Sequence, residues 1–160
     1  MKGIYVASRA SISARPAMWR AYRDAGWPIV STWIDEAGPG QTADLGELWE
    51  RIGREVRGSC GVVLYAEPGD FPLHGALVEV GMALGAGLPV AVVAPGTDDD
   101  WTTSRKIGSW VLHPRVETYA SVEDAMEALI ERRAEKAPRG PCGMLHHAHD
   151  CECEGAGGDR

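Results

Sequence analysis

The sequence lacks the features that would place the protein in a membrane or on nucleic acid. None of its apolar runs reaches the roughly 18 residues that a membrane-spanning helix needs. It has no dense run of lysine and arginine, its formal net charge is −7 and its pI is about 5.2. We therefore expect neither a membrane nor a nucleic acid as a partner. The opening residues, MKGIYVAS, show no secretory signal pattern, which favours a cytoplasmic protein.

Cysteine is scarce in the body of the chain, where Cys60 stands alone before the C-terminal segment. This distribution does not resemble a disulfide framework and indicates a reducing compartment. Residues 134–160 are rich in Gly, Pro, Cys and His without periodicity, so we expect a disordered tail after one domain at residues 1–133. The tail has potential zinc ligands but no Cys-x-x-Cys pair, so disorder and chance metal binding rank above a zinc site. These ligands are Cys142, His146, His147, His149, Cys151 and Cys153.

The body of the chain alternates apolar, β-rich runs with amphipathic or apolar helical patterns. The expected strands are residues 3–7, 29–34, 61–66, 89–94 and 116–119, and the expected helices are residues 16–26, 44–58, 75–85 and 121–133. This alternation predicts an α/β fold, a single-domain parallel sheet of about five strands with helices on both faces, as in flavodoxin-like or Rossmann-like architectures. In such sheets the ligand crevice lies beyond the carboxyl ends of the strands. The loops at residues 8–14, 35–43 and 67–74 are expected to open there.

Glu79 is the one ionisable residue in the expected helix at residues 75–85, which is otherwise apolar. An apolar helix belongs inside the protein, so this carboxylate must be paired, protonated or facing a cleft. The helix dipole favours the anion by about 0.3–1 kcal/mol. A carboxylate kept ionised at an apolar crevice is suited to be a nucleophile. The alternative is an ordinary glutamate near a helix start that touches solvent.

Several segments occur in an order and spacing that resemble the nucleoside 2-deoxyribosyltransferase family, which is similar to several nucleotide N-hydrolases. They are Ile4-Tyr5-Val6-Ala7-Ser8, Val62-Val63-Leu64-Tyr65, Gly75-Ala-Leu-Val-Glu79-Val-Gly81, Leu88-Pro89-Val90 and Gly108-Ser109-Trp110. The resemblance covers roughly residues 2–129. The Gly-x-x-x-Glu-x-Gly element is its most specific part.

The resemblance implies an enzyme that attacks the N-glycosidic bond of a 2′-deoxynucleoside or its 5′-monophosphate. Glu79 matches the family's nucleophile, which forms a covalent glycosyl-enzyme, and Tyr5 matches the tyrosine that orients it. Passing the sugar to another base would make the protein a transferase, and passing it to water would make it a hydrolase. This chemistry implies no metal and no organic cofactor.

Two positions depart from the family pattern, because Ile52 and Cys60 stand where aspartates are usual. The proton donor for the leaving base is therefore expected to be Asp70, with Asp44 as the alternative. The missing aspartate at Ile52 also favours a second hypothesis, a non-catalytic nucleotide-binding module of the same fold.

The remaining site residues are expected to contact the substrate. Ser8 and Arg9, between the first strand and helix, are candidates for a phosphate site, against an ordinary solvated loop. Trp33 is a candidate for stacking on a base, against a packing role. The full expected substrate-binding set is Ser8, Arg9, Trp33, Asp44, Gly75 and Arg115. Arg115 matches a family position that reaches a neighbouring subunit, so we expect a homo-oligomer. The acidic run 98–100 is expected to be a solvated turn rather than a cation site.

Overall fold

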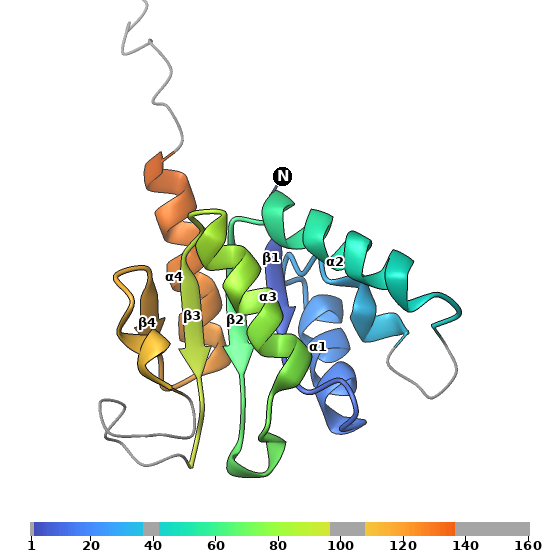
Figure 1. Ribbon diagram of the computed structural model, residues 1–160. Helices are drawn as coiled ribbons and strands as arrows, with labels where there is room; N and C mark the ends of the chain where they lie inside the picture. The colour runs from blue at the N-terminus through green and yellow to red at the C-terminus, as the bar shows by residue number, and fades with distance from the viewer. Residues whose placement is uncertain (1, 37–41, 97–107, 137–160) are drawn as a thin grey trace, which may run out of the picture.

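The computed structural model describes residues 2–36, 42–96 and 108–136. Within them the chain forms one parallel sheet in the order β1-β2-β3-β4 (Figure 1). The strands are β1 (Ile4–Ala7), β2 (Gly61–Tyr65), β3 (Val90–Val93) and β4 (Val116–Thr118). Every residue of β1 and of β3 is buried, as in strands that are covered on both faces. This explains why these runs are apolar throughout instead of alternating.

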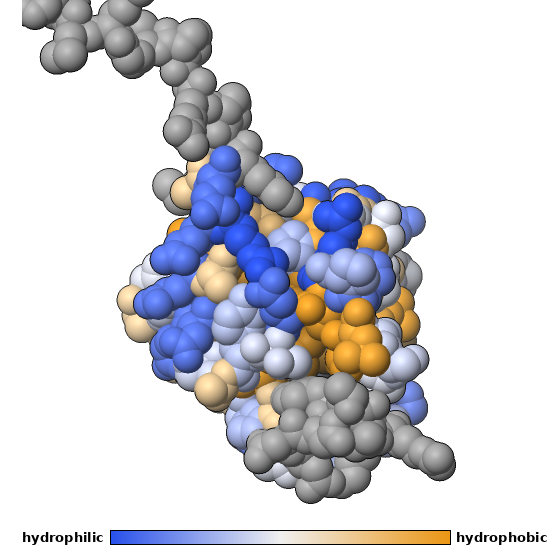
Figure 2. Space-filling view, turned by 90° about the vertical axis from the view of Figure 1, so that its left-hand side faces the viewer, coloured by the Kyte–Doolittle hydropathy of each residue, from blue (hydrophilic) through white to orange (hydrophobic). Residues whose placement is uncertain are grey.

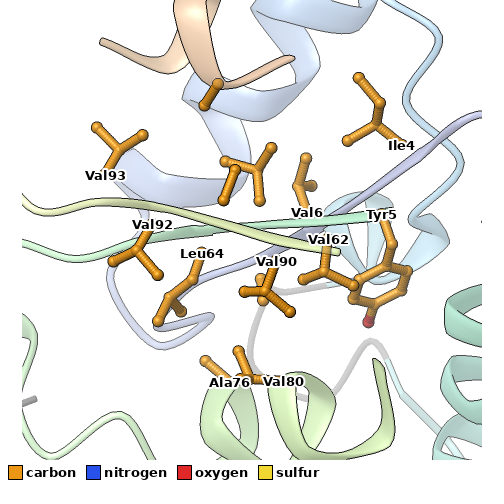
Figure 3. Packing of buried hydrophobic residues seen from close by; sticks show 14 of the residues in the cluster. Ile4, Tyr5, Val6, Val62, Leu64, Ala76, Val80, Val90, Val92 and Val93 are labelled. Carbon is orange, nitrogen blue, oxygen red and sulfur yellow. The ribbon is translucent and has the colours of Figure 1, made fainter. Parts of the chain in front are cut away.

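Helices cover both faces of the sheet, as the sequence predicts. They are α1 (Ala14–Asp24), α2 (Leu45–Gly58), α3 (His74–Gly85) and α4 (Val122–Lys136). In Figure 1, α3 lies in front of the strands and α4 lies behind them. The Tyr22 hydroxyl donates to Glu123 at 2.7 Å, which joins α1 to α4, and α2 packs against α3. The core between these layers contains the strand valines and the Ala76 and Val80 side chains of α3 (Figure 3).

The expected strand at residues 29–34 is wrong, so the described sheet has four strands instead of five. Only Ile29 forms a parallel bridge, to Ile4, and residues Thr32–Asp35 form a short 3-10 helix, η1. Side chains replace the missing ladder: Ser31 Oγ accepts the Val6 N–H at 2.7 Å, and the Trp33 indole N–H donates to the Val6 carbonyl at 2.8 Å. Because these groups already satisfy the edge of β1, no further strand pairing is needed there.

The segment at Ile29 nevertheless lies on the outer side of β1, while β2 lies on the other side. The chain therefore reverses its direction of winding at β1, and ligands of such sheets bind at that point beyond the strand carboxyl ends. This topology directs attention to the loop after Ala7.

Some expectations fall at the limits of the described chain. Helix α4 ends at Lys136, three residues beyond the expected domain boundary at 133. The Cys/His tail and the acidic run 98–100 lie outside the described residues. Cys60 is a free thiol. In the part of the chain that the structure describes, no helix has both the length and the apolar character needed to cross a membrane.

Candidate active site

A cavity of about 370 Å³ opens beside the carboxyl end of β1. Each of the three loops expected at this edge contributes to its wall, together with α2 and α3. The lining includes Ser8, Arg9 and Ser11 after β1, Trp33 and Glu36 around η1, Leu48, Trp49 and Ile52 on α2, and His74, Gly75 and Glu79 on α3. The cavity therefore combines an apolar, aromatic wall with a small number of polar groups, which is typical of sites for small molecules.

Glu79 belongs to the stripe of α3 that faces the sheet. Ala76, Val80 and Ala83 share this stripe at helical spacing, and Glu79 is only 6% exposed. Its Oε2 atom is buried and has no hydrogen-bond partner among the described residues. A buried polar atom without a partner is costly and is commonly found where a ligand or water completes the site. Glu79 thus lines the cavity.

Tyr5 lies in the middle of β1, with its hydroxyl on the side of the sheet where α3 lies (Figure 3). This hydroxyl is also buried without a hydrogen-bond partner among the described residues. Burial, together with the nearby Glu79 and Glu55 carboxylates, raises the pKa of Tyr5, so the hydroxyl keeps its proton. In turn the nearby Tyr5 hydroxyl lowers the pKa of Glu79, although the Tyr5 hydroxyl and the Glu79 Oε2 atom are too far apart or too poorly aligned to count as hydrogen-bonded. A donor and an acceptor therefore face one another beside the cavity.

The protonation of Glu79 differs from the expectation that the helix dipole keeps it ionised. The pKa of Glu79 is raised to about 8, because the raising effects of burial and of the Glu55 carboxylate exceed the lowering effect of the Tyr5 hydroxyl. Removing a carboxylate from water costs several kcal/mol, while a helix dipole supplies only about 0.3–1 kcal/mol. Burial therefore outweighs the dipole and favours the protonated form of Glu79.

Ser8 and Arg9 both line the cavity, and both also make contacts within the protein. The Ser8 hydroxyl accepts the Trp19 indole N–H at 2.9 Å. The Arg9 Nε donates to Ser11 Oγ at 3.1 Å, and its Nη1 donates to the carbonyls of Asp70 and Phe71 at 3.2 and 3.3 Å. Arg9 therefore links the loop after β1 to the loop before α3, with its guanidinium at the cavity wall.

Asp70 is not among the described residues that line the cavity, which argues against its expected role as proton donor. It is 1% exposed, and its two oxygens accept from Arg15 Nε and Nη2 at 3.0 and 2.9 Å. The backbone N–H of Glu67 also donates to it, at 2.9 Å. Arg15 contacts the Glu67 carboxylate as well, at 3.0 Å. Since these bonds occupy the carboxylate, Asp70 holds the loop before α3 in place.

Trp33 and Gly75 shape the aromatic wall of the cavity. Trp33 is 5% exposed and fixed through its indole N–H, so it both packs in the core and borders the cavity. A Cβ at Gly75 would lie 3.2 Å from the ring of Trp49, so a glycine at this position lets that ring lie against α3.

Asp44 and Arg115 lie outside this cavity. Asp44 is the N-cap of α2, where its side chain accepts from the N–H groups of Gly46 and Glu47 at 2.7 and 3.1 Å. Arg115 directly precedes β4, at the opposite end of the sheet, and donates to the Gly87 carbonyl at 2.8 Å. Asp44 is thus a capping residue rather than a substrate ligand, and Arg115 is too far along the sheet to serve the cavity of its own chain.

Several lining residues were not identified as site residues from the sequence, among them Glu36, Trp49 and His74. Trp49 follows an amphipathic pattern on α2 that is equally typical of a core residue. His74 begins α3, with a φ of 28°. Glu36 follows η1 and forms an ion pair with Arg51 of α2, at 2.7 Å between Oε1 and Nη2. This ion pair depends on how η1 packs against α2, which no local pattern reveals.

The outer face of α3 is apolar as well, contrary to the expectation of an entirely internal helix. Leu77 is 36% exposed and Val78 is 50% exposed. A second hollow of about 220 Å³ is lined by Leu77, Val80, Gly81, Leu84 and Trp110. Figure 2 shows apolar side chains gathered on one side of the molecule. An apolar surface of this kind commonly marks an interaction site.

Compared with solved structures, the chain is similar to a 2-deoxyribosyltransferase from Leishmania mexicana. The TM-score is 0.58 and the identity 16%, over 82% of this chain and 98% of that chain. Neither a protein-family model nor a curated protein matches the sequence. The parallel four-stranded sheet with its covering helices is therefore a deoxyribosyltransferase-like α/β fold.

Proposed function

We propose that the protein is an enzyme that cleaves or exchanges the N-glycosidic bond of a 2′-deoxynucleoside or its 5′-monophosphate. The main support is Glu79, a buried carboxyl group that lines a ligand-sized cavity with one oxygen unbonded and the Tyr5 hydroxyl beside it. The similarity of the fold to a 2-deoxyribosyltransferase supports the same type of bond.

In the proposed reaction, an ionised oxygen of Glu79 attacks the anomeric carbon of the sugar. The electron pair of the C–N bond leaves with the base, which takes up a proton, and an ester joins the sugar to Glu79. Water then opens the ester in a hydrolase, or the nitrogen of a second base opens it in a transferase. Tyr5 orients the carboxylate and stabilises its charge through its hydroxyl hydrogen. Asp70 is not retained as the proton donor, because Arg15 occupies both of its oxygens.

The competing proposal is a nucleotide-binding module without catalysis. Ile52 lines the cavity at the position where the resembled family has an aspartate, and Asp70 is committed to an ion pair. A pocket without a proton donor for the leaving base would still bind nucleosides.

One assay separates the two proposals. Purified protein is incubated with each 2′-deoxynucleoside and each 5′-monophosphate, with and without a second free base, and the products are separated by chromatography. Release of free base without an acceptor indicates a hydrolase, and formation of a new nucleoside indicates a transferase. Binding of nucleosides without either product would support the non-catalytic module and contradict the enzyme.

Arg9→Ala is expected to raise KM about tenfold for 5′-monophosphates and to leave KM for unphosphorylated nucleosides unchanged. The reason is that Arg9 presents a guanidinium at the cavity wall, beside Ser8 and Ser11, and guanidinium groups bind phosphate oxygens in pairs. Steady-state kinetics on both substrate types check this.

Arg9→Lys serves as the control for Arg9→Ala, because it keeps the charge but not the paired hydrogen bonds. An equal loss with both substrate types would show that Arg9 only holds the loop before α3.

We also propose that the protein is a homo-oligomer in which a second copy covers the outer face of α3. Light scattering is expected to give a multiple of 17.2 kDa, and Leu77→Lys is expected to reduce the mass to a single chain. The exposed Leu77 and Val78 and the hollow beside Trp110 support this. A single-chain mass for the unmodified protein would contradict the proposal. The expected reach of Arg115 into a neighbouring cavity stays a prediction.

A further inference from the structure

The cavity has two chemically different walls, which are held by different parts of the fold. Arg9 is fixed to the loop before α3 through the carbonyls of Asp70 and Phe71. Glu36 is fixed to α2 through Arg51, at 2.7 Å. Glu79 lines the same cavity. A ligand that spans this cavity thus meets a cation on one wall and an anion on another.

The wall next to Glu36 suits a flat aromatic ring. Trp33, Leu48, Trp49 and Ile52 line it, and they offer apolar and aromatic surface with no side-chain charge. Nucleobases stack on such aromatic surfaces in proteins that bind single strands. On the proposed function, the base of the substrate lies along this wall, and its edge comes next to Glu36.

An ionised carboxylate only accepts hydrogen bonds, and the carboxylate of Glu36 forms an ion pair with Arg51. A carboxylate has about four acceptor positions, and Arg51 contacts Oε1, so acceptor capacity remains for the cavity. Cytosine and adenine offer an amino group at the base edge, and guanine offers an amino group beside a ring N–H. Thymine and uracil have no amino group and offer a single ring N–H, which lies between two carbonyl oxygens that a carboxylate repels.

We infer that Glu36 reads the edge of the base and selects nucleosides whose base has an amino group, an inference that rests on the proposed function. Arg51 holds Glu36 in place through the ion pair. The pair joins the residues after η1 to α2, so the recognising group has a fixed position in the lining of the cavity.

The test measures binding to the Glu79→Gln protein, so that no turnover disturbs it, with quenching of tryptophan fluorescence as the signal. Two matched pairs differ at the amino group: deoxycytidine against deoxyuridine, and deoxyguanosine against deoxyinosine, each also as the 5′-monophosphate. We expect at least about tenfold tighter binding of the amino-bearing member of each pair.

Adding Glu36→Gln is expected to remove this preference, because an amide both donates and accepts. Glu50→Gln, a similar change on an exposed position of α2, should leave the preference intact. Thermal melting of both variants checks that they fold.

Each outcome decides the inference. Equal binding of the paired bases overturns it, and so does an equal loss for all bases in Glu36→Gln, which would show a purely structural ion pair. If amino-bearing bases bind preferentially but the unmodified protein releases no free base, the enzyme proposal fails while the base-reading role of Glu36 stands. If no nucleoside binds at all, both fail together.

Discussion

Glu79→Gln is expected to reduce the release of free base from deoxynucleosides by about 10³-fold or more, because the amide cannot form the covalent ester. Glutamine has nearly the same volume and fits the same buried stripe of α3, so the fold should be retained. Product formation measured by chromatography checks this. Glu127→Gln, an equivalent change at an exposed position of α4, should have no effect. Activity above a tenth of the unmodified protein would exclude Glu79 as the nucleophile.

The raised pKa of Glu79 predicts that Glu79→Gln also changes how the stability of the protein depends on pH. The folded pKa is about 8, against an ordinary value of 4.5, so the folded chain keeps the proton while the unfolded chain loses it between these two values. Stability from this group therefore falls as pH rises from about 4.5 to about 8. Glutamine has no proton to lose, so Glu79→Gln should gain stability relative to the unmodified protein across that window.

The same protonation predicts the pH profile of the unmodified enzyme. Because the ionised form is the nucleophile, kcat/KM should rise with pH and level off above about 8. A profile that falls over this range would contradict the assignment of Glu79.

Asp70→Ala is expected to destabilise the protein by about 3–5 kcal/mol, since it leaves the buried Arg15 guanidinium without its main partner. Arg15 is 8% exposed and Asp70 is 1% exposed, and two hydrogen bonds join them. The Glu67 carboxylate also contacts Arg15, but it is 43% exposed and compensates only partly. Urea denaturation followed by fluorescence measures the change.

The pair between Arg23 and Asp35 provides a matched control for Asp70→Ala. It is also bidentate, through Arg23 Nη1 and Nη2 with both distances at 2.8 Å, but both side chains are partly exposed. Asp35→Ala should therefore cost only about 0–1 kcal/mol. Similar losses for the two variants would show that burial does not set the strength of the Asp70 pair. Retained folding with lost base release in Asp70→Ala would show that catalysis requires Asp70 itself or the loop that it holds.

The sequence by itself determined the parts of the fold that depend on local hydrophobic patterns. The apolar runs at residues 4–7, 61–65 and 90–93 became buried parallel strands, because such runs need cover on both faces. Asp44 with Glu47 predicted the start of α2, since a short acidic side chain caps exposed backbone N–H groups. Glu79 was identifiable because a single carboxyl group in an apolar helix is physically conspicuous.

Only the tertiary structure decided which polar groups meet. Residues 29–34 have the composition of a strand. The side chains of Ser31 and Trp33, however, bond the backbone N–H and carbonyl of Val6 at the edge of β1, so the backbone pairing ends there. Asp70 looked available as an acid, and Arg15, distant in sequence, bonds both of its oxygens. The ionisation of Glu79 depends on its burial, which a helix pattern does not specify. Ion pairs and desolvation arise between segments that are far apart in the chain. The partners of a polar group and its ionisation are therefore set by tertiary packing and not by the local sequence.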